Sequence, residues 1–393
     1  MESKPSGALS KRLENVPASV MFEFADRIRV LQEQGINITD LSLGQPEVPA
    51  PGHIARALQR ALEKPILSYT SAAGSQELRS LIANKLSQES GREVTVSQVI
   101  VTCGSKHALF ITLLSLLDPG DEIIVHEPYF PPYAEIAGLT GAKLTTVPVA
   151  VNSETGFSLD VDEMIAAVTS KTKVILVNYP NNPAGWTLDG GKIKRLADFC
   201  MSRGIYFVSD EIYDKIVFDG KVHTHAWEYS DQSRHVIELG SFSKTYSMVP
   251  YRLGFIVAKD GVCSELLKTQ RATITMVSPY IQAAGSAALK GPQDFVAQRL
   301  RKYEERRDKC VELLSKQNIR VAKPEGAFYL FVKMPDKVNV AKFALDFLEE
   351  EHIALLPGEI FGIRWRNYVR MSFATPDENL YPAIERFSKR YGN

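Results

Sequence analysis

The sequence predicts an α/β protein with a mostly parallel seven-stranded sheet, helices on both of its faces, and a second, smaller α+β domain. In the middle of the chain, short β-rich runs alternate with helical patterns, which is typical of a parallel sheet covered on both faces. After about residue 290 the pattern changes to long helices with two further strands. At 393 residues the chain is also longer than one simple core requires, which favours two domains.

Seven short apolar runs are predicted as the strands of the large sheet. They are Val99–Thr102, Glu122–His126, Leu144–Val147, Lys173–Asn178, Tyr206–Ser209, Val236–Gly240 and Gly254–Ala258. Helical patterns lie between them, notably at Lys106–Leu117 and Gly191–Met201. Because crossovers between parallel strands are right-handed, ligands are expected at the carboxyl ends of the strands.

The C-terminal part supplies the elements of the smaller domain. We expect helices and strands at Ala297–Leu314, Ala327–Phe331, Val340–Glu351, Tyr368–Phe373 and Asn379–Tyr391. The amphipathic stretch Val20–Gln34 needs a surface to pack on, and we place it with this domain. The prediction is therefore a large domain over residues 46–290 and a small domain formed by residues 1–45 and 291–393.

Charge and cysteine usage exclude several classes of function. Lys plus Arg number 46 and Asp plus Glu number 46, so a net charge of zero gives no electrostatic reason to bind nucleic acid or an anionic membrane. No apolar run approaches the roughly 20 residues that span a bilayer, and the first residues lack the apolar core of a secretory signal. The four cysteines lie far apart without a CxxC pair, which predicts neither disulfides nor a metal site and favours a reducing cytoplasm.

Three clusters of polar residues fall at predicted strand ends. Asn178 opens the segment NYPNNPAG, Asp210 closes the run VSD, and Ser241-Phe242-Ser243-Lys244 follows the next run, with Arg252 eight residues further on. Alone, each cluster has a plainer interpretation: Asn and Pro suit turns, an Asp after a strand often caps a helix, and Ser-x-Ser-Lys arises by chance. Asp210 and Lys244 are 34 residues apart, however, about one strand–helix–strand repeat, so successive strand ends bring them side by side.

In this order, the motifs resemble those of the class I/II aminotransferases, which are fold type I enzymes dependent on pyridoxal 5′-phosphate (PLP), and the aspartate aminotransferase-like branch in particular. The similarity extends from Leu41 to Phe373. Its most specific parts are NYPNNPAG (178–185), SDEIY (209–213), SFSKTYSMVPYRLGF (241–255) and PEGAFY (324–329).

The resemblance implies a catalytic set around PLP. Lys244 would hold the cofactor as an imine and then move a proton between the substrate Cα and the cofactor, with a pKa lowered by cationic neighbours. Asp210 would lie against the pyridine nitrogen and keep it protonated. Asn182 and Tyr213 match the family's partners of the phenolic oxygen.

The resemblance also implies a phosphate site and a homodimer. Gly104-Ser105-Lys106 open a predicted helix, where free backbone N–H groups attract an anion. The matching side-chain ligands of the phosphate are Ser241, Ser243 and Arg252. Tyr69 matches a tyrosine that reaches the phosphate of the neighbouring subunit, and Phe130 matches a ring stacked on the cofactor.

For the substrate, the resemblance assigns Arg370 and Asn182 to the α-carboxylate, with the backbone at Gly44 close by. Lys106 matches a lysine that meets the distal carboxylate in some aspartate-using relatives, although it fits a solvent-facing lysine equally well. Ala18 and Val20 replace small hydroxyl residues of those relatives, and Phe22 and Phe24 make the mouth more apolar. An aromatic, large neutral, cationic or aspartate-like amino acid therefore remains open as the substrate.

The sequence departs from the family pattern at a few positions. Pro250-Tyr251 stands where Gly-Trp is usual, Ala184 stands where Thr is commonest, and Trp186 is expected as a surface aromatic rather than a lid. The first hypothesis is an aminotransferase that uses an amino acid and a 2-oxo acid. The second is a PLP-dependent lyase, replacement or cyclising enzyme. A regulator without turnover would need a DNA-binding extension, for which the N-terminal tail has no room.

Overall fold

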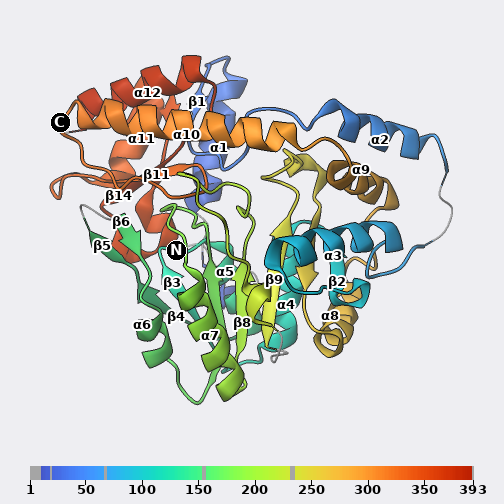
Figure 1. The fold of residues 1–393 in the computed structure, drawn as a ribbon. Coiled ribbons are helices and arrows are strands. Elements are labelled where there is room, and N and C mark those ends of the chain that lie inside the picture. Colours follow the sequence, from blue (N-terminus) through green and yellow to red (C-terminus); the bar gives the residue numbers. More distant parts are fainter. Residues whose placement is uncertain (1–9, 18–19, 66–68, 153–155, 231–234, 392–393) are drawn as a thin grey trace.

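A computed structural model describes residues 10–17, 20–65, 69–152, 156–230 and 235–391, without the side chains of residues 20–23. Its centre is a seven-stranded sheet in the order β2-β10-β9-β8-β7-β3-β4 (Figure 1). The strands are β2 (Val99–Thr102), β3 (Glu122–Glu127), β4 (Lys143–Pro148), β7 (Thr172–Asn178), β8 (Tyr206–Asp210), β9 (Val236–Ser241) and β10 (Gly254–Val257). All pair in parallel except β10, which is antiparallel to both neighbours. The predicted mostly parallel seven-stranded sheet is confirmed.

Successive side chains of the central strands point to opposite faces of the sheet, and both faces are apolar. In β7, Ile175 and Val177 belong to one buried cluster, whereas Val174 and Leu176 belong to another. Helices α6 (Val161–Ala166) and α7 (Gly190–Arg203) pack on the first cluster. The second is covered by α4 (Ser105–Leu116), α5 (Pro132–Thr140) and α8 (Asp260–Thr273). The sheet is therefore an inner layer, as its continuous apolar runs predict.

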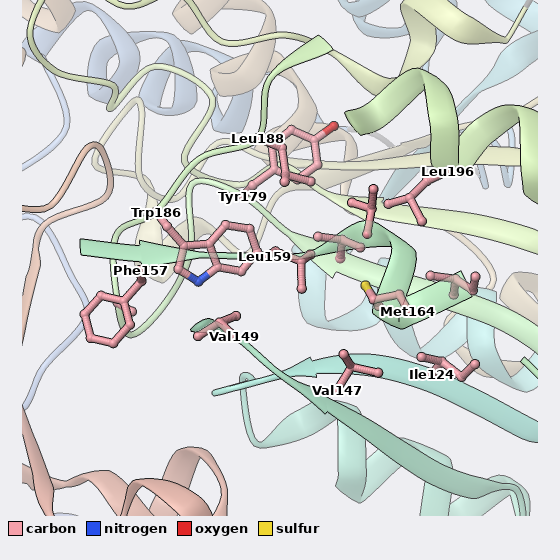
Figure 2. Packing of buried hydrophobic residues seen from close by; sticks show 14 of the residues in the cluster. Ile124, Val147, Val149, Phe157, Leu159, Met164, Tyr179, Trp186, Leu188 and Leu196 are labelled. Carbon is pink, nitrogen blue, oxygen red and sulfur yellow. The ribbon is translucent and has the colours of Figure 1, made fainter. Parts of the chain in front are cut away.

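Figure 2 shows the first of these clusters, in which Trp186 lies among aliphatic and aromatic side chains that include Val149, Phe157 and Leu159. Only 2% of Trp186 is exposed, and its ring packs edge-on against His126, with 4.9 Å between the ring centroids. The expectation of a surface aromatic is wrong, because the NYPNNPAG segment returns the chain to the sheet and buries the indole in the core.

The C-terminal part forms a second layered unit. Helices α10 (Asp294–Ser315) and α12 (Asp377–Arg390) lie side by side, with α11 (Val340–Glu351) nearby (Figure 1). They enclose an antiparallel sheet of β11 (Tyr329–Lys333), β14 (Tyr368–Ser372) and β13 (Leu356–Pro357). Ile28 and Leu31 of α1 (Val20–Glu33) pack against Leu348 and Ala354, so α1 contacts this unit.

Shorter elements complete the fold. Helix α9 (Pro279–Lys290) contacts both α2 (Gly52–Leu62) and α3 (Gln76–Ser90), and α3 packs beside β2. β1 (Thr39–Asp40) pairs in parallel with β12 (Ile353–Ala354), and β5 (Ala150–Asn152) forms a hairpin with β6 (Gly156–Ser158). None of the helices in the described parts of the chain is long and apolar enough to cross a membrane.

Candidate active site

A cavity of about 490 Å³ opens beyond the carboxyl ends of β7, β8 and β9. The strand register places Asn178 opposite Asp210 at this edge, and Lys244 follows the end of β9 by three residues. The predicted site residues that line the cavity are Gly44, Ser105, Lys106, Phe130, Asn182, Tyr213, Ser243, Lys244, Arg252 and Arg370. Asp210 and Ser241 are buried at the strand ends next to it. One compartment therefore collects residues from distant parts of the chain.

Lys244 projects into this compartment from the loop after β9. Its ammonium donates a hydrogen bond to the backbone oxygen of Gly44. Burial, followed by the positive charges of Arg370 and Arg252, lowers the pKa of Lys244 to about 8. The expected cationic neighbours are present, but burial is the larger cause. The result is an amine that is partly unprotonated near neutral pH.

Asp210 ends β8 and is buried. Its Oδ2 atom accepts a 2.7 Å hydrogen bond from the hydroxyl of Tyr133, whereas Oδ1 has no well-formed hydrogen bond among the described residues. Burial raises the pKa of Asp210 to about 6. An unpaired buried acceptor is costly, and a donor placed opposite Oδ1 would remove that cost. Tyr133 is not predicted from the sequence, because a tyrosine in EPYFPPY gives no local signal of a hydrogen bond to Asp210.

Arg370 lies on β14 and is buried, and both terminal nitrogens of its guanidinium are hydrogen-bonded. One terminal nitrogen donates to Oδ1 of Asn182 at 2.8 Å, and the other donates to the backbone oxygen of Ser42. Its Nε atom has no hydrogen-bond partner within the described part of the chain. The guanidinium also lies over the ring of Tyr329, 4.4 Å from the centroid, and burial lowers its pKa. A planar cation held this way is suited to a carboxylate.

Hydrogen bonds between neighbouring segments hold the surrounding groups in place. The hydroxyls of Tyr213 and Tyr329 lie 2.7 Å apart, and burial raises the pKa of Tyr213 well above its usual value. The backbone N–H of Asn182 donates to Oδ1 of Asn178 at 2.9 Å. A Cβ atom at Gly44 would overlap the hydroxyl of Tyr329, so glycine is required for this close approach.

The start of α4 and the loop after Lys244 form a cradle suited to an anion. Gly104 precedes α4 with a φ of +79°, and no side chain caps the helix start. A Cβ atom at Gly104 would overlap the guanidinium of Arg252, whose own φ is +53°. The backbone N–H of Ser243 donates to Oγ of Ser241 at 3.1 Å. Open N–H groups, hydroxyls and a guanidinium thus meet at one edge of the cavity.

Other predicted residues have mixed outcomes. Phe130 lines the cavity and meets Tyr133 edge-on at 5.8 Å between centroids. Tyr69 is 83% exposed and does not line this chain's own cavity. Lys106 is 48% exposed and forms an ion pair with Glu135, while Val249 beside the unusual Pro250-Tyr251 lines the cavity.

The predicted apolar mouth is only partly described. Ala18 lies outside the described residues, as do the side chains of Val20 and Phe22. Phe24 is buried and lines the cavity.

Comparisons with known proteins give a consistent family. The model of the family "Aminotransferase class I and II" matches residues 36–387. The aspartate aminotransferase of Sulfurisphaera tokodaii is 34% identical over 368 residues, 92% of this chain and 92% of that protein. The aromatic-amino-acid aminotransferase 2 of Thermococcus litoralis is 32% identical over 387 residues, 97% of this chain and 98% of that protein. The crystal structure of the Thermotoga maritima aspartate aminotransferase matches with a TM-score of 0.91 and 31% identity, covering 98% of this chain and 100% of that one.

The cavity also fits the cofactor of this family. PLP has a ring nitrogen, a phosphate and an aldehyde, and the cavity region presents an unpaired carboxylate oxygen, an anion cradle and a buried lysine amine. The chain therefore belongs to the class I and II aminotransferases and is a PLP-dependent enzyme of that family.

Proposed function

We propose that this aminotransferase moves the amino group of an L-amino acid to a 2-oxo acid, with Lys244 as the residue that holds PLP. The observation that carries the proposal is that Lys244 and Arg370 line one cavity, with Asp210 buried at the strand end beside it. Asp210 and Arg370 each keep a buried polar atom that has no partner among the described residues. Such atoms are rare in native proteins and indicate where a ligand completes the hydrogen bonds.

Asp210 and Lys244 would divide the chemistry between them. When bound, PLP supplies the electron sink that makes the Cα–H bond of an amino acid acidic. Oδ1 of Asp210 is available to accept from the protonated ring nitrogen, and its negative charge favours that protonated form. The amine of Lys244, with its pKa lowered to about 8, would take the proton from the substrate Cα and deliver it to the C4′ carbon of the cofactor.

The remaining residues would bind and orient. Arg370 and Asn182, which are already hydrogen-bonded to each other, would grip the α-carboxylate beside Gly44. Phe130 is proposed to pack on the ring face, and the Tyr213 hydroxyl to donate to the ring's phenolic oxygen. The phosphate would be held by Ser105, the N–H groups at the start of α4, Ser241, Ser243 and Arg252.

We further propose a homodimer with shared active sites. Tyr69 is 83% exposed and is not among the described residues that line the cavity of its own chain, which suits a side chain that completes the site of a second copy. A holoenzyme mass of two chains in sedimentation equilibrium is the expected result.

The experiment uses purified holoenzyme and single amino acids without a 2-oxo acid. We expect the yellow cofactor to convert once per site to the pyridoxamine form, with one 2-oxo acid released per site, because the amino group stays on the cofactor until an acceptor arrives. Absorbance and product analysis measure both quantities. Repeated turnover that releases ammonia or a cyclised product would contradict the proposal and favour the lyase or cyclising hypothesis.

A further inference from the structure

One face of α1 forms a wall of the cavity and is largely apolar. Phe24, Ile28 and Gln32 are spaced four residues apart, so they lie on the same side of the helix, and all three line the cavity. Leu43 and Leu356 line it as well. A substrate side chain that extends toward these residues is transferred from water to an apolar surface.

The cations around the cavity are already engaged. Among the described residues that line it, the cationic side chains are Arg29, Lys106, Lys244, Arg252 and Arg370. The proposed function assigns the last three to the cofactor and to the α-carboxylate. Arg29 is 65% exposed and faces Asp26 at 3.2 Å and Glu33 at 3.7 Å on its own helix. Among these five cations, only Lys106 is left to pair with the side-chain carboxylate of a dicarboxylic substrate.

Lys106 is paired with an acid that is less exposed than itself. Its ammonium donates to Oε2 of Glu135 at 3.4 Å, and the Glu135 side chain is only 16% exposed. Glu135 lies in the first turn of α5, where the helix dipole favours its negative charge. Lys106 therefore already has an acidic partner before a substrate arrives, and a second carboxylate would have to compete with Glu135 for it.

A second acid faces the cavity directly. Asp40 lines it and accepts a 2.8 Å hydrogen bond from the backbone N–H of Ser42. Its charge repels a second carboxylate in the same space. The charges of Glu135 and Asp40 thus act in the same direction, and both disfavour a dicarboxylic substrate.

Resting on the proposed function, we propose that the preferred amino acid has a large, uncharged apolar side chain, and that Glu135 sets this preference by pairing with Lys106. Aromatic and large aliphatic amino acids fit the α1 wall. Aspartate would leave its distal carboxylate beside two acids and a cation that is already paired. Glu135 is thus a specificity-determining residue that acts through Lys106.

The test compares kcat/KM for L-phenylalanine and L-aspartate in the amino-donor half-reaction of the holoenzyme. For the wild type we expect phenylalanine to exceed aspartate by about 100-fold, since a site with unmatched polar groups discriminates strongly. Glu135→Gln frees Lys106, so aspartate should gain at least about fivefold while phenylalanine changes by less than about twofold. Adding Lys106→Ala to that variant should remove the gain.

Glu265→Gln is the matched control, because Glu265 is 63% exposed and pairs with Lys268 away from the cavity. Its two kcat/KM values should equal those of the wild type. A kcat/KM for phenylalanine close to that of the wild type shows that the Glu135→Gln variant is folded. A wild type that prefers aspartate, or a phenylalanine-to-aspartate ratio that Glu135→Gln leaves unchanged, would overturn this inference. Failure of every amino acid to convert the cofactor would instead overturn the proposed function.

Discussion

At the level of single residues, burial shifts the pKa of an acid and the pKa of an amine in opposite directions. It raises the pKa of Asp210 to about 6 and lowers the pKa of Lys244 to about 8. Compared with an ordinary lysine, Lys244 then has roughly 300-fold more unprotonated amine near neutrality, as follows from the change in pKa. Both shifts bring the two groups toward the pH range in which proton transfer is useful.

Asp210→Asn tests the acid. The amide has the same shape but no charge, so it no longer favours a protonated ring nitrogen. We expect the half-reaction rate to fall by about 100-fold or more while PLP remains attached, as is typical when one electrostatic group of an active site is removed. Stopped-flow absorbance measures the rate. Asp198→Asn, at an exposed ion pair with Lys194, should keep the wild-type rate; equal rates for both variants would refute the role of Asp210.

Residues with chemistry at strand ends could be predicted from the sequence, but their partners could not. Lys244 and Asp210 stood out because polar groups followed apolar runs, and Arg370 stood out only through the family resemblance; Lys244 and Arg370 line one cavity, with Asp210 buried beside it. Tyr133 and Tyr329 are also part of that constellation. They were missed because their positions depend on how α5 and β11 pack on the rest of the chain, which a local pattern does not specify.

At the scale of elements, a buried network of hydrogen bonds joins β8 to β9. Nδ1 of His225 lies 2.8 Å from Glu211, the residue that follows β8, and 3.0 Å from Glu238 on β9, and Nε2 lies 3.5 Å from Glu89 on α3. Burial alone would lower the pKa of His225, but the three carboxylates outweigh it and raise the pKa well above its usual value. A charged imidazole therefore connects the strand that carries Asp210 to the strand that leads to Lys244.

This network predicts how stability depends on pH. Because the pKa of His225 is raised in the folded state, its contribution is complete below the unfolded value of about 6.5 and is lost as pH rises through the folded value. His225→Gln should cost about 3 kcal/mol of unfolding free energy at pH 6, as expected for a broken buried ion pair, and flatten the dependence above pH 6.5. Thermal unfolding of the holoenzyme across pH 6–9 measures this.

The exposed His352 provides the control for that experiment. It ends α11 with a φ of +56°, a conformation that Asn tolerates, so His352→Asn should retain the pH dependence of the wild type. If His225→Gln retained it too, the charged state of His225 would not be the cause.

The positions of the strands in the large sheet were easier to predict from the sequence than the direction of each strand or the pairing of very short strands. The seven apolar runs became the seven strands, since a continuous apolar run is buried on both faces in any such sheet. That β10 runs antiparallel depends on which strands it lies between. Strands of two residues, such as β1 and β12, are too short to show a periodic pattern. They form because the fold brings two segments that are distant in the sequence next to each other.

At the scale of the whole molecule, the cavity lies where distant segments meet. α1 and the loop after β1 supply Phe24 and Gly44, the loops after β7 and β9 supply Asn182 and Lys244, and β14 supplies Arg370. We propose that residues 46–290 and the combined segments 1–45 and 291–393 are the two domains whose junction forms this site. A substrate bound by Arg370 would then touch both domains at once.

Borohydride reduction of the holoenzyme shows which lysine holds PLP in this enzyme. We expect reduction to fix one PLP per chain and peptide mass spectrometry to place it on Lys244, whereas Lys244→Ala, which still has the anion cradle, should bind PLP without a reducible link. PLP fixed to another lysine of the wild type, or still fixed covalently in Lys244→Ala, would contradict the account.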